Sequence, residues 1–162
     1  MQKFFFISIH EPPASIRLAP LIHALAVTVE PLKFELHACT DITGFGIAGH
    51  LLEVARGSST RIILKYAELP LYPGALDMYR KGETTDSNGG NRLMVRGNME
   101  IQASLTGFEE ELLFDPQTSG GLLLSVPGPR AEELVAALSA AGVQAAVRVA
   151  EIIEGPPEIL VV

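Results

Sequence analysis

The chain has 162 residues, of which 48% are hydrophobic and 19% are charged. This length and composition predict one domain with a sizeable core and exclude a chain that is disordered throughout. The formal net charge of −7 repels phosphate backbones, so we expect no nucleic-acid partner.

The cysteine content and the apolar runs indicate the cellular compartment in which the protein is expected. The only cysteine, Cys39, excludes an internal disulfide and a multi-cysteine metal site, which is typical of a reduced, cytoplasmic protein. No apolar run reaches the roughly 18 residues that span a membrane, so we expect no membrane partner. The apolar stretch near the N-terminus is interrupted by His10, Glu11 and two prolines, which argues against a secretory signal.

Residues 1–33 are the hardest part of the chain to assign. "FFFISI" is typical of a buried strand, and "EPPAS" ends it. In "IRLAPLIHALAVTV" nearly every position is apolar, so periodicity does not separate helix from strand. We expect His23, inside this run, to be a packed core histidine rather than a ligand.

A strand followed by a helix is predicted next. "FELHACTD", from Phe34 to Asp41, has the pattern of a strand that ends in a polar residue. Thr43 is the predicted N-cap of a helix over Gly44–Arg56, and Gly57 is predicted to end it. Apolar residues cover most of the circumference of this helix, so we expect it to be largely buried.

The middle of the chain has weaker signals. "TRIILKY" predicts a strand, and a short helix is expected between Pro73 and Gly82. We expect residues 83–92, "ETTDSNGGNR", to form a polar, glycine-rich loop, and residues 92–105 to be weakly helical.

The C-terminal part is more regular. It predicts a strand over Leu122–Val126, a helix over residues 128–141, and closing strands over residues 144–153 and 158–162. The strands and helices alternate on both sides of the loop-rich middle. This order predicts an α+β (mixed α/β) fold in which helices back a mixed β-sheet.

Asp41 is the first candidate for chemistry, because it stands where the predicted strand turns into the predicted helix. A carboxylate at such an edge is a hard oxygen donor suited to Mg²⁺. Unpaired amides of Gly44–Ile47, at the start of the helix, would favour an anion. The alternative is that Asp41 only caps the helix, and the residues alone slightly favour this alternative.

The glycines of the same segment have a simpler interpretation. "GFGIAG" matches a dinucleotide-binding fingerprint in its letters, but the acidic residue expected about twenty positions later is absent from Ser59–Ile63. We therefore expect Gly46 and Gly49 to allow close packing of the helix.

The histidines and the cysteine are weaker candidates. His37 and Cys39 share one face of the predicted strand, but nothing nearby would lower the pKa of the thiol, so a nucleophilic pair is disfavoured. His50 is expected to pair with Glu53 on the helix, in a solvated or supporting role.

"FDPQTSGG", from Phe114 to Gly121, is the second dense polar cluster. Thr118 and Ser119 offer hydroxyls, and the amides that follow are able to form an anion-binding concavity. A tight turn stabilised by Asp115 explains the same residues equally well.

Together, "HACTDITGFGIAGHLLEVA" and "LLFDPQTSGGLLLSVP" resemble the C-terminal domain of selenophosphate synthetase (selenide, water dikinase). "DPQTSGG" is the more discriminating motif, because "TDxTGFG" has looser relatives in aminoimidazole ribonucleotide synthetase and thiamine monophosphate kinase. The resemblance covers His37–Glu154 and implies the sheet-and-helix domain shared within that superfamily.

The resemblance also implies an activity. The family makes selenophosphate from selenide, ATP and water, and it releases AMP and phosphate. By resemblance Asp41 binds the Mg²⁺ that holds the ATP phosphates, which reverses the preference for capping. His37 and Cys39 become packing residues, the loop Asp115–Gly121 receives no ligand role, and the enzyme is expected to be a homodimer.

The resemblance divides the chain into residues 1–33, which do not match the family, and residues 34–162, the synthetase C-terminal domain. The family's N-terminal ATP-binding domain is not found. That domain carries the reactive cysteine or selenocysteine, a lysine and further metal-binding aspartates, so we expect no catalytic residue on this chain. Phosphoryl transfer needs several charges placed around the metal and the phosphates, so the chain alone is expected not to make selenophosphate.

Two alternatives stay open. The first is a non-catalytic binding or interaction module of the same fold, in which residues 1–33 cover the face left exposed by the missing domain. The second is another ATP-using synthetase or kinase of the superfamily that acts on a different small molecule. Only the resemblance of "DPQTSGG" argues against the second.

Overall fold

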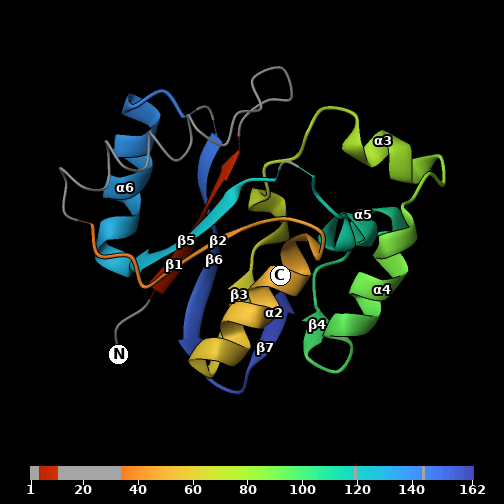
Figure 1. Ribbon diagram of the computed structural model, residues 1–162, viewed down its shortest axis with the longest axis horizontal. Coiled ribbons are helices and arrows are strands. Elements are labelled where there is room, and N and C mark those ends of the chain that lie inside the picture. Colours follow the sequence, from red (N-terminus) through yellow and green to blue (C-terminus); the bar gives the residue numbers. More distant parts are fainter. Residues whose placement is uncertain (1–3, 11–33, 119, 144) are drawn as a thin grey trace.

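The computed structural model describes residues 4–10, 34–118, 120–143 and 145–162. In this part of the chain seven strands form one mixed sheet in the order β2-β5-β1-β6-β3-β7-β4 (Figure 1). The pairs β3–β7 and β7–β4 are parallel, and the other pairs are antiparallel. The strands are β1 Phe4–His10, β2 Ala38–Asp41, β3 Thr60–Leu64, β4 Met99–Ile101, β5 Leu122–Pro127, β6 Ala145–Glu154 and β7 Glu158–Val161.

Helices cover both faces of this sheet. Residues Leu122, Leu124 and Val126 of β5 pack in one hydrophobic cluster with α6, whereas Leu123 packs in a second cluster with α2. Successive strand residues point to opposite faces, so α2 and α6 lie on opposite sides of the sheet (Figure 1). The helices are α2 Gly46–Ser58, α3 Ala75–Arg80, α4 Asp86–Val95, α5 Gly107–Glu111 and α6 Gly128–Ala140, with 3₁₀ turns η2 Tyr66–Glu68 and η3 Leu112–Phe114.

These observations confirm the predicted α+β fold with helices on a mixed sheet. A strand buried on both faces needs a nearly continuous apolar run, which β5 has except at the buried Ser125. Among the described residues, no helix combines the length and the apolar character needed to cross a membrane.

Strand β1 lies inside the sheet, between β5 and β6. It pairs antiparallel with both neighbours over most of its length. The strand predicted for "FFFISI" is therefore confirmed, and it is paired on both sides within the sheet. The prediction for His23 falls outside the described residues.

The predicted boundaries of α2 were wrong at both ends. The N-cap position belongs to Phe45 and not to Thr43, and no side chain caps the helix. Gly57 lies inside the helix. Ser59 adopts the left-handed conformation that ends the helix, with a φ of 53°.

The main error in the fold prediction concerns residues 83–92, which were predicted to be a loop. Helix α4 occupies Asp86–Val95. Its two consecutive glycines disfavour a helix by about 1 kcal/mol each, which explains the loop prediction. Tertiary contacts compensate, because Asn88, Asn91 and Val95 are buried against the rest of the domain. The expected weak helix over residues 92–105 is replaced, after α4, by β4.

Candidate functional site

Asp41 is the last residue of β2, which is an edge strand of the sheet. Its side chain is exposed. Its backbone carbonyl accepts a hydrogen bond from the Thr40 hydroxyl at 3.3 Å, whereas its carboxylate forms no hydrogen bond or ion pair with the described residues. Helix α2 begins only at Gly46 and has no side-chain cap, so the capping alternative for Asp41 is wrong.

The exposed carboxylate fits a cation that is held mostly by other ligands. Mg²⁺ is usually bound by one or two protein carboxylates together with phosphate and water oxygens. No group of three or more His, Cys, Asp or Glu side chains in the described part of the chain is placed to hold a metal. Asp41 therefore suits a shared site and not a self-contained one.

The loop that follows Asp41 is hydrogen-bonded to the second motif. The Ile42 N–H donates to the carbonyl of Gly121 at 2.8 Å, and the Gln117 N–H donates to the carbonyl of Thr43 at 3.0 Å. At Gly120, a Cβ would lie 1.9 Å from the carbonyl oxygen of Ile42. The two sequence motifs thus form one interlocked unit, which we call the motif junction (residues 41–46 and 114–121, excluding Ser119).

Glycine is also required where α2 meets this junction. Gly46 has a φ of +65°, and a Cβ there would lie 2.9 Å from the backbone carbon of Phe114. A Cβ at Gly49 would lie 2.7 Å from the Met94 side chain. Both glycines therefore allow close packing, which confirms that prediction and not the dinucleotide fingerprint.

Asn91 of α4 joins the two halves of the motif junction. Its buried side-chain amide donates to the carbonyls of Gly44 and Phe114, each at 2.9 Å. Sequence reasoning missed Asn91 because it lay in the predicted loop. Its spacing of three residues from Asn88, which places both on one helix face, was the available signal.

His50 is buried and not solvated. Its Nε2 lies 3.0 Å from the Thr43 backbone nitrogen and 3.1 Å from the Thr43 hydroxyl oxygen. Its Nδ1 lies 3.1 Å from Oε2 of Glu53, which confirms the predicted pair.

The backbone amides at the start of α2 were expected to be unpaired and to favour an anion. One of them, that of Gly46, donates to the carbonyl of Thr43 at 3.1 Å. The anion site predicted there is therefore smaller than expected.

The carboxylate of Asp115 is hydrogen-bonded within the turn and to α3. It accepts hydrogen bonds from the Tyr79 hydroxyl and from Nε2 of Gln117. Burial and the hydrogen bond to Asp115 raise the pKa of the Tyr79 hydroxyl. Of the two interpretations of "DPQTSGG", the turn stabilised by Asp115 has direct hydrogen-bond support. Thr118 is exposed, and Ser119 lies outside the described residues.

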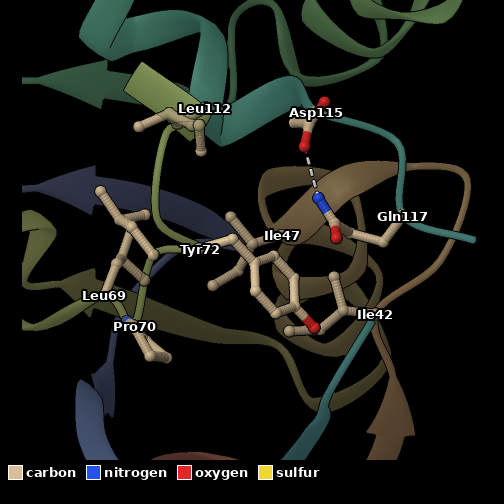
Figure 2. A pocket seen from close by; sticks show the side chains of 10 residues that line it. Ile42, Ile47, Leu69, Pro70, Tyr72, Leu112, Asp115 and Gln117 are labelled. Atoms are coloured by element: carbon tan, nitrogen blue, oxygen red, sulfur yellow. Dashed lines mark hydrogen bonds between the residues drawn. The ribbon is translucent and has the colours of Figure 1, made fainter. Parts of the chain in front are cut away.

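A small pocket of about 60 Å³ lies behind the motif junction (Figure 2). Its lining is mostly apolar, with Asp115 and Gln117 hydrogen-bonded to each other on one side. Asp41 is not part of the lining. The pocket has room for a few water molecules and is too small for a triphosphate, so it is not the site that Asp41 would serve.

His37 and Cys39 are both exposed, so the expectation that they are packing residues was wrong. Shielding by neighbouring atoms and the Asp41 carboxylate raise the pKa of the Cys39 thiol. A thiol with a raised pKa is mostly protonated at neutral pH. The nucleophilic pair that the sequence disfavoured gains no support.

With this geometry in place, comparison with known proteins decides the family. Residues 10–162 match the family described as AIR synthase related protein, C-terminal domain. The chain belongs to this family.

Two similar curated proteins have the same name. A protein of Pelobacter propionicus named selenide, water dikinase is 43% identical over 129 residues, which are 80% of this chain and 37% of that protein. A protein of the same name from Dechloromonas aromatica is 39% identical over 127 residues, which are 78% of this chain and 36% of that protein. The chain thus spans about a third of the length of the curated relatives it matches.

Solved structures show the same fold. The structure of a HypE–HypF complex matches with a TM-score of 0.64 at 13% identity, over 98% of this chain and 48% of that chain. HypE, a hydrogenase maturation protein, in complex with ATP matches with a TM-score of 0.57 at 17% identity, over 92% of this chain and 42% of that chain. At these identities the likeness concerns the fold alone.

Proposed function

We propose that this chain forms the C-terminal part of a selenide, water dikinase, which makes selenophosphate from selenide, ATP and water and releases AMP and phosphate. In this proposal residues 34–162, together with strand β1 inside their sheet, form the synthetase C-terminal domain. An N-terminal domain supplies the reactive cysteine or selenocysteine. The names of the curated relatives support the activity. The complex of HypE with ATP supports ATP as a ligand of proteins with this fold.

The observation that carries the proposal is the exposed Asp41 carboxylate, which is free of hydrogen bonds and ion pairs with the described residues and lies at the edge of the motif junction. We propose that it contributes one ligand to the Mg²⁺ that holds the ATP phosphates. When bound, the metal would neutralise phosphate charge. The chain's own part is to hold one carboxylate at a fixed place, through the hydrogen bonds of Ile42 and Thr43.

The rest of the site belongs to the other domain in this proposal. No cluster of metal-binding side chains surrounds Asp41 in the described part of the chain, so a single carboxylate would bind Mg-ATP weakly. The homodimer and the cytoplasmic location implied by the resemblance and the cysteine content belong to the same proposal.

The test combines this chain with the separately produced N-terminal portion of the Pelobacter propionicus relative. AMP release is measured with selenide, ATP and Mg²⁺. We expect no release by the chain alone and measurable turnover by the mixture. We expect Asp41→Asn to lower kcat/KM about 100-fold, because electrostatic stabilisation by one positioned group is worth that much.

Asp77→Asn is the matched control, since Asp77 is an exposed carboxylate that pairs with Arg80 on the surface of α3. It should leave turnover unchanged. Two results would contradict the proposal: turnover by the chain alone at the rate of a full-length relative, or equal activity of the Asp41→Asn and Asp77→Asn mixtures.

A further inference from the structure

We propose that His50 is a positioning residue that holds the backbone of Thr43, and with it the Asp41 loop, as a neutral imidazole protonated at Nδ1. The inference rests on the proposed function for its link to ATP use. We call the hydrogen bond between Nε2 of His50 and the Thr43 amide the brace. The brace is a property of the fold and is tested separately.

The hydrogen bonds of His50 determine which nitrogen carries the proton. A backbone N–H is always a donor, so Nε2, at 3.0 Å from the Thr43 nitrogen, must present its lone pair. The ring proton is then on Nδ1, where it is donated to Oε2 of Glu53 at 3.1 Å. Protonation of Nε2 would place two donors face to face, so the brace requires the neutral ring.

Thr43 is held from both sides by this arrangement. Its N–H is bonded to His50, while its carbonyl accepts from the amides of Gly46 and Gln117 at 3.1 and 3.0 Å. The preceding residue, Ile42, is buried and donates to the carbonyl of Gly121. The backbone after Asp41 is therefore held in place at consecutive residues, and His50 is the one side chain that supplies a partner to the Thr43 amide within the described residues.

The burial of His50 argues against a looser role. Only 6% of its surface is exposed, and the ring of Phe45 lies 5.6 Å from its own ring. Loss of the Nε2 acceptor would leave the Thr43 N–H without its partner in a partly buried loop, which is costly. The expected consequence is a loop in which Asp41 is no longer fixed relative to the second motif.

Two substitutions distinguish the roles of the two ring nitrogens of His50. In His50→Gln the side-chain oxygen reaches the place of Nε2 and keeps the acceptor for Thr43. In His50→Asn the shorter amide reaches only the place of Nδ1 and keeps the contact with Glu53. If His50 only fills space, both substitutions should impair the protein. The two variants should then differ from each other only in stability.

The first readout uses this chain alone, labelled with ¹⁵N. The ¹⁵N shifts of His50 should show the neutral tautomer protonated at Nδ1. The Thr43 amide should exchange its hydrogen about tenfold faster in His50→Asn than in the wild type, whereas His50→Gln should stay close to the wild type. A ring protonated at Nε2, or a Thr43 exchange rate that is the same in all three proteins, would overturn the brace.

The second readout uses the two-part enzyme, in which this chain is mixed with the N-terminal portion of the relative. We expect His50→Asn to raise the KM for Mg-ATP about tenfold, with a smaller change in kcat, and His50→Gln to restore it. Equal KM values for His50→Asn and the wild type would overturn the positioning role. If Asp41→Asn is fully active while Thr43 exchange still depends on His50, the proposed function fails and the brace stands, so the two failures are distinguishable.

Discussion

Gly120→Ala is expected to lower the free energy of unfolding by more than about 3 kcal/mol, or to prevent folding. The added Cβ would lie 1.9 Å from the carbonyl oxygen of Ile42 and 2.9 Å from its carbonyl carbon. Both are backbone atoms of the residue that follows β2, so the clash is not relieved by the movement of a flexible side chain. Relief of the clash must separate the two motifs, which breaks the hydrogen bond from Ile42 to Gly121. Urea denaturation followed by circular dichroism measures the loss.

Gly90→Ala is the matched control for this prediction. Gly90 lies inside α4, and no atom outside its chain neighbours and its own helix backbone would come within 4 Å of an added Cβ. Alanine has the higher helix propensity, so this substitution should raise the free energy of unfolding by about 0.5–1 kcal/mol. Equal stability of Gly120→Ala and the wild type would contradict the close approach of the two motifs.

Asn91→Asp is expected to destabilise the protein by about 3–5 kcal/mol at pH 7, although the side chain keeps its shape. The amide of Asn91 donates to the carbonyls of Gly44 and Phe114. A carboxylate donates nothing and would place a buried negative charge against two carbonyl oxygens. The cost is that of an unpaired buried charge, measured by urea denaturation against the wild type at each pH.

The pH dependence of this variant has a definite sign. Burial and the facing carbonyls favour the protonated form, so the new carboxyl has a pKa in the folded state above its unfolded value of about 3.9. The folded state then holds the proton more tightly. The stability deficit should therefore be smallest below the unfolded pKa and should grow as pH rises through the folded pKa.

Asn98→Asp provides the control, because Oδ1 of Asn98 accepts a hydrogen bond from Arg56 and a carboxylate would still accept it. This substitution loses only the donation to the carbonyl of Pro157, at 3.4 Å. We expect a change of at most about 1 kcal/mol. A loss as large as that of Asn91→Asp would show that the effect is not specific to the motif junction.

The sequence predicted those elements whose pattern follows from local chemistry. The apolar run of β5, the proline near the start of α6 and the glycine after its end were sufficient to predict both elements. Helix α4 was not predictable in this way, because Gly89 and Gly90 oppose a helix locally and Asn88 and Asn91 stabilise it through distant partners.

The candidate site also contains residues that the sequence indicated and residues that it did not. Asp41 was identified from its place at the end of a strand and from the resemblance of the surrounding motif. The contacts of Asn91 were not identified, because its hydrogen bonds reach 47 and 23 residues along the chain. For His50 the pair with Glu53 was predicted, but the contact with Thr43 was not. The pairing of His50 with Thr43 was hidden by the wrong helix start, which gave Thr43 the role of N-cap.

The central claim is that Asp41 is a ligand of the metal that holds the ATP phosphates. The most direct measurement is a crystal structure of this chain combined with the N-terminal portion of a relative, with Mn²⁺ and a non-hydrolysable ATP analogue. Anomalous scattering locates the metal. We expect a manganese peak about 2.1 Å from an Asp41 carboxylate oxygen, which disappears in Asp41→Asn crystals. Bound nucleotide and manganese with no contact to Asp41 would contradict the account.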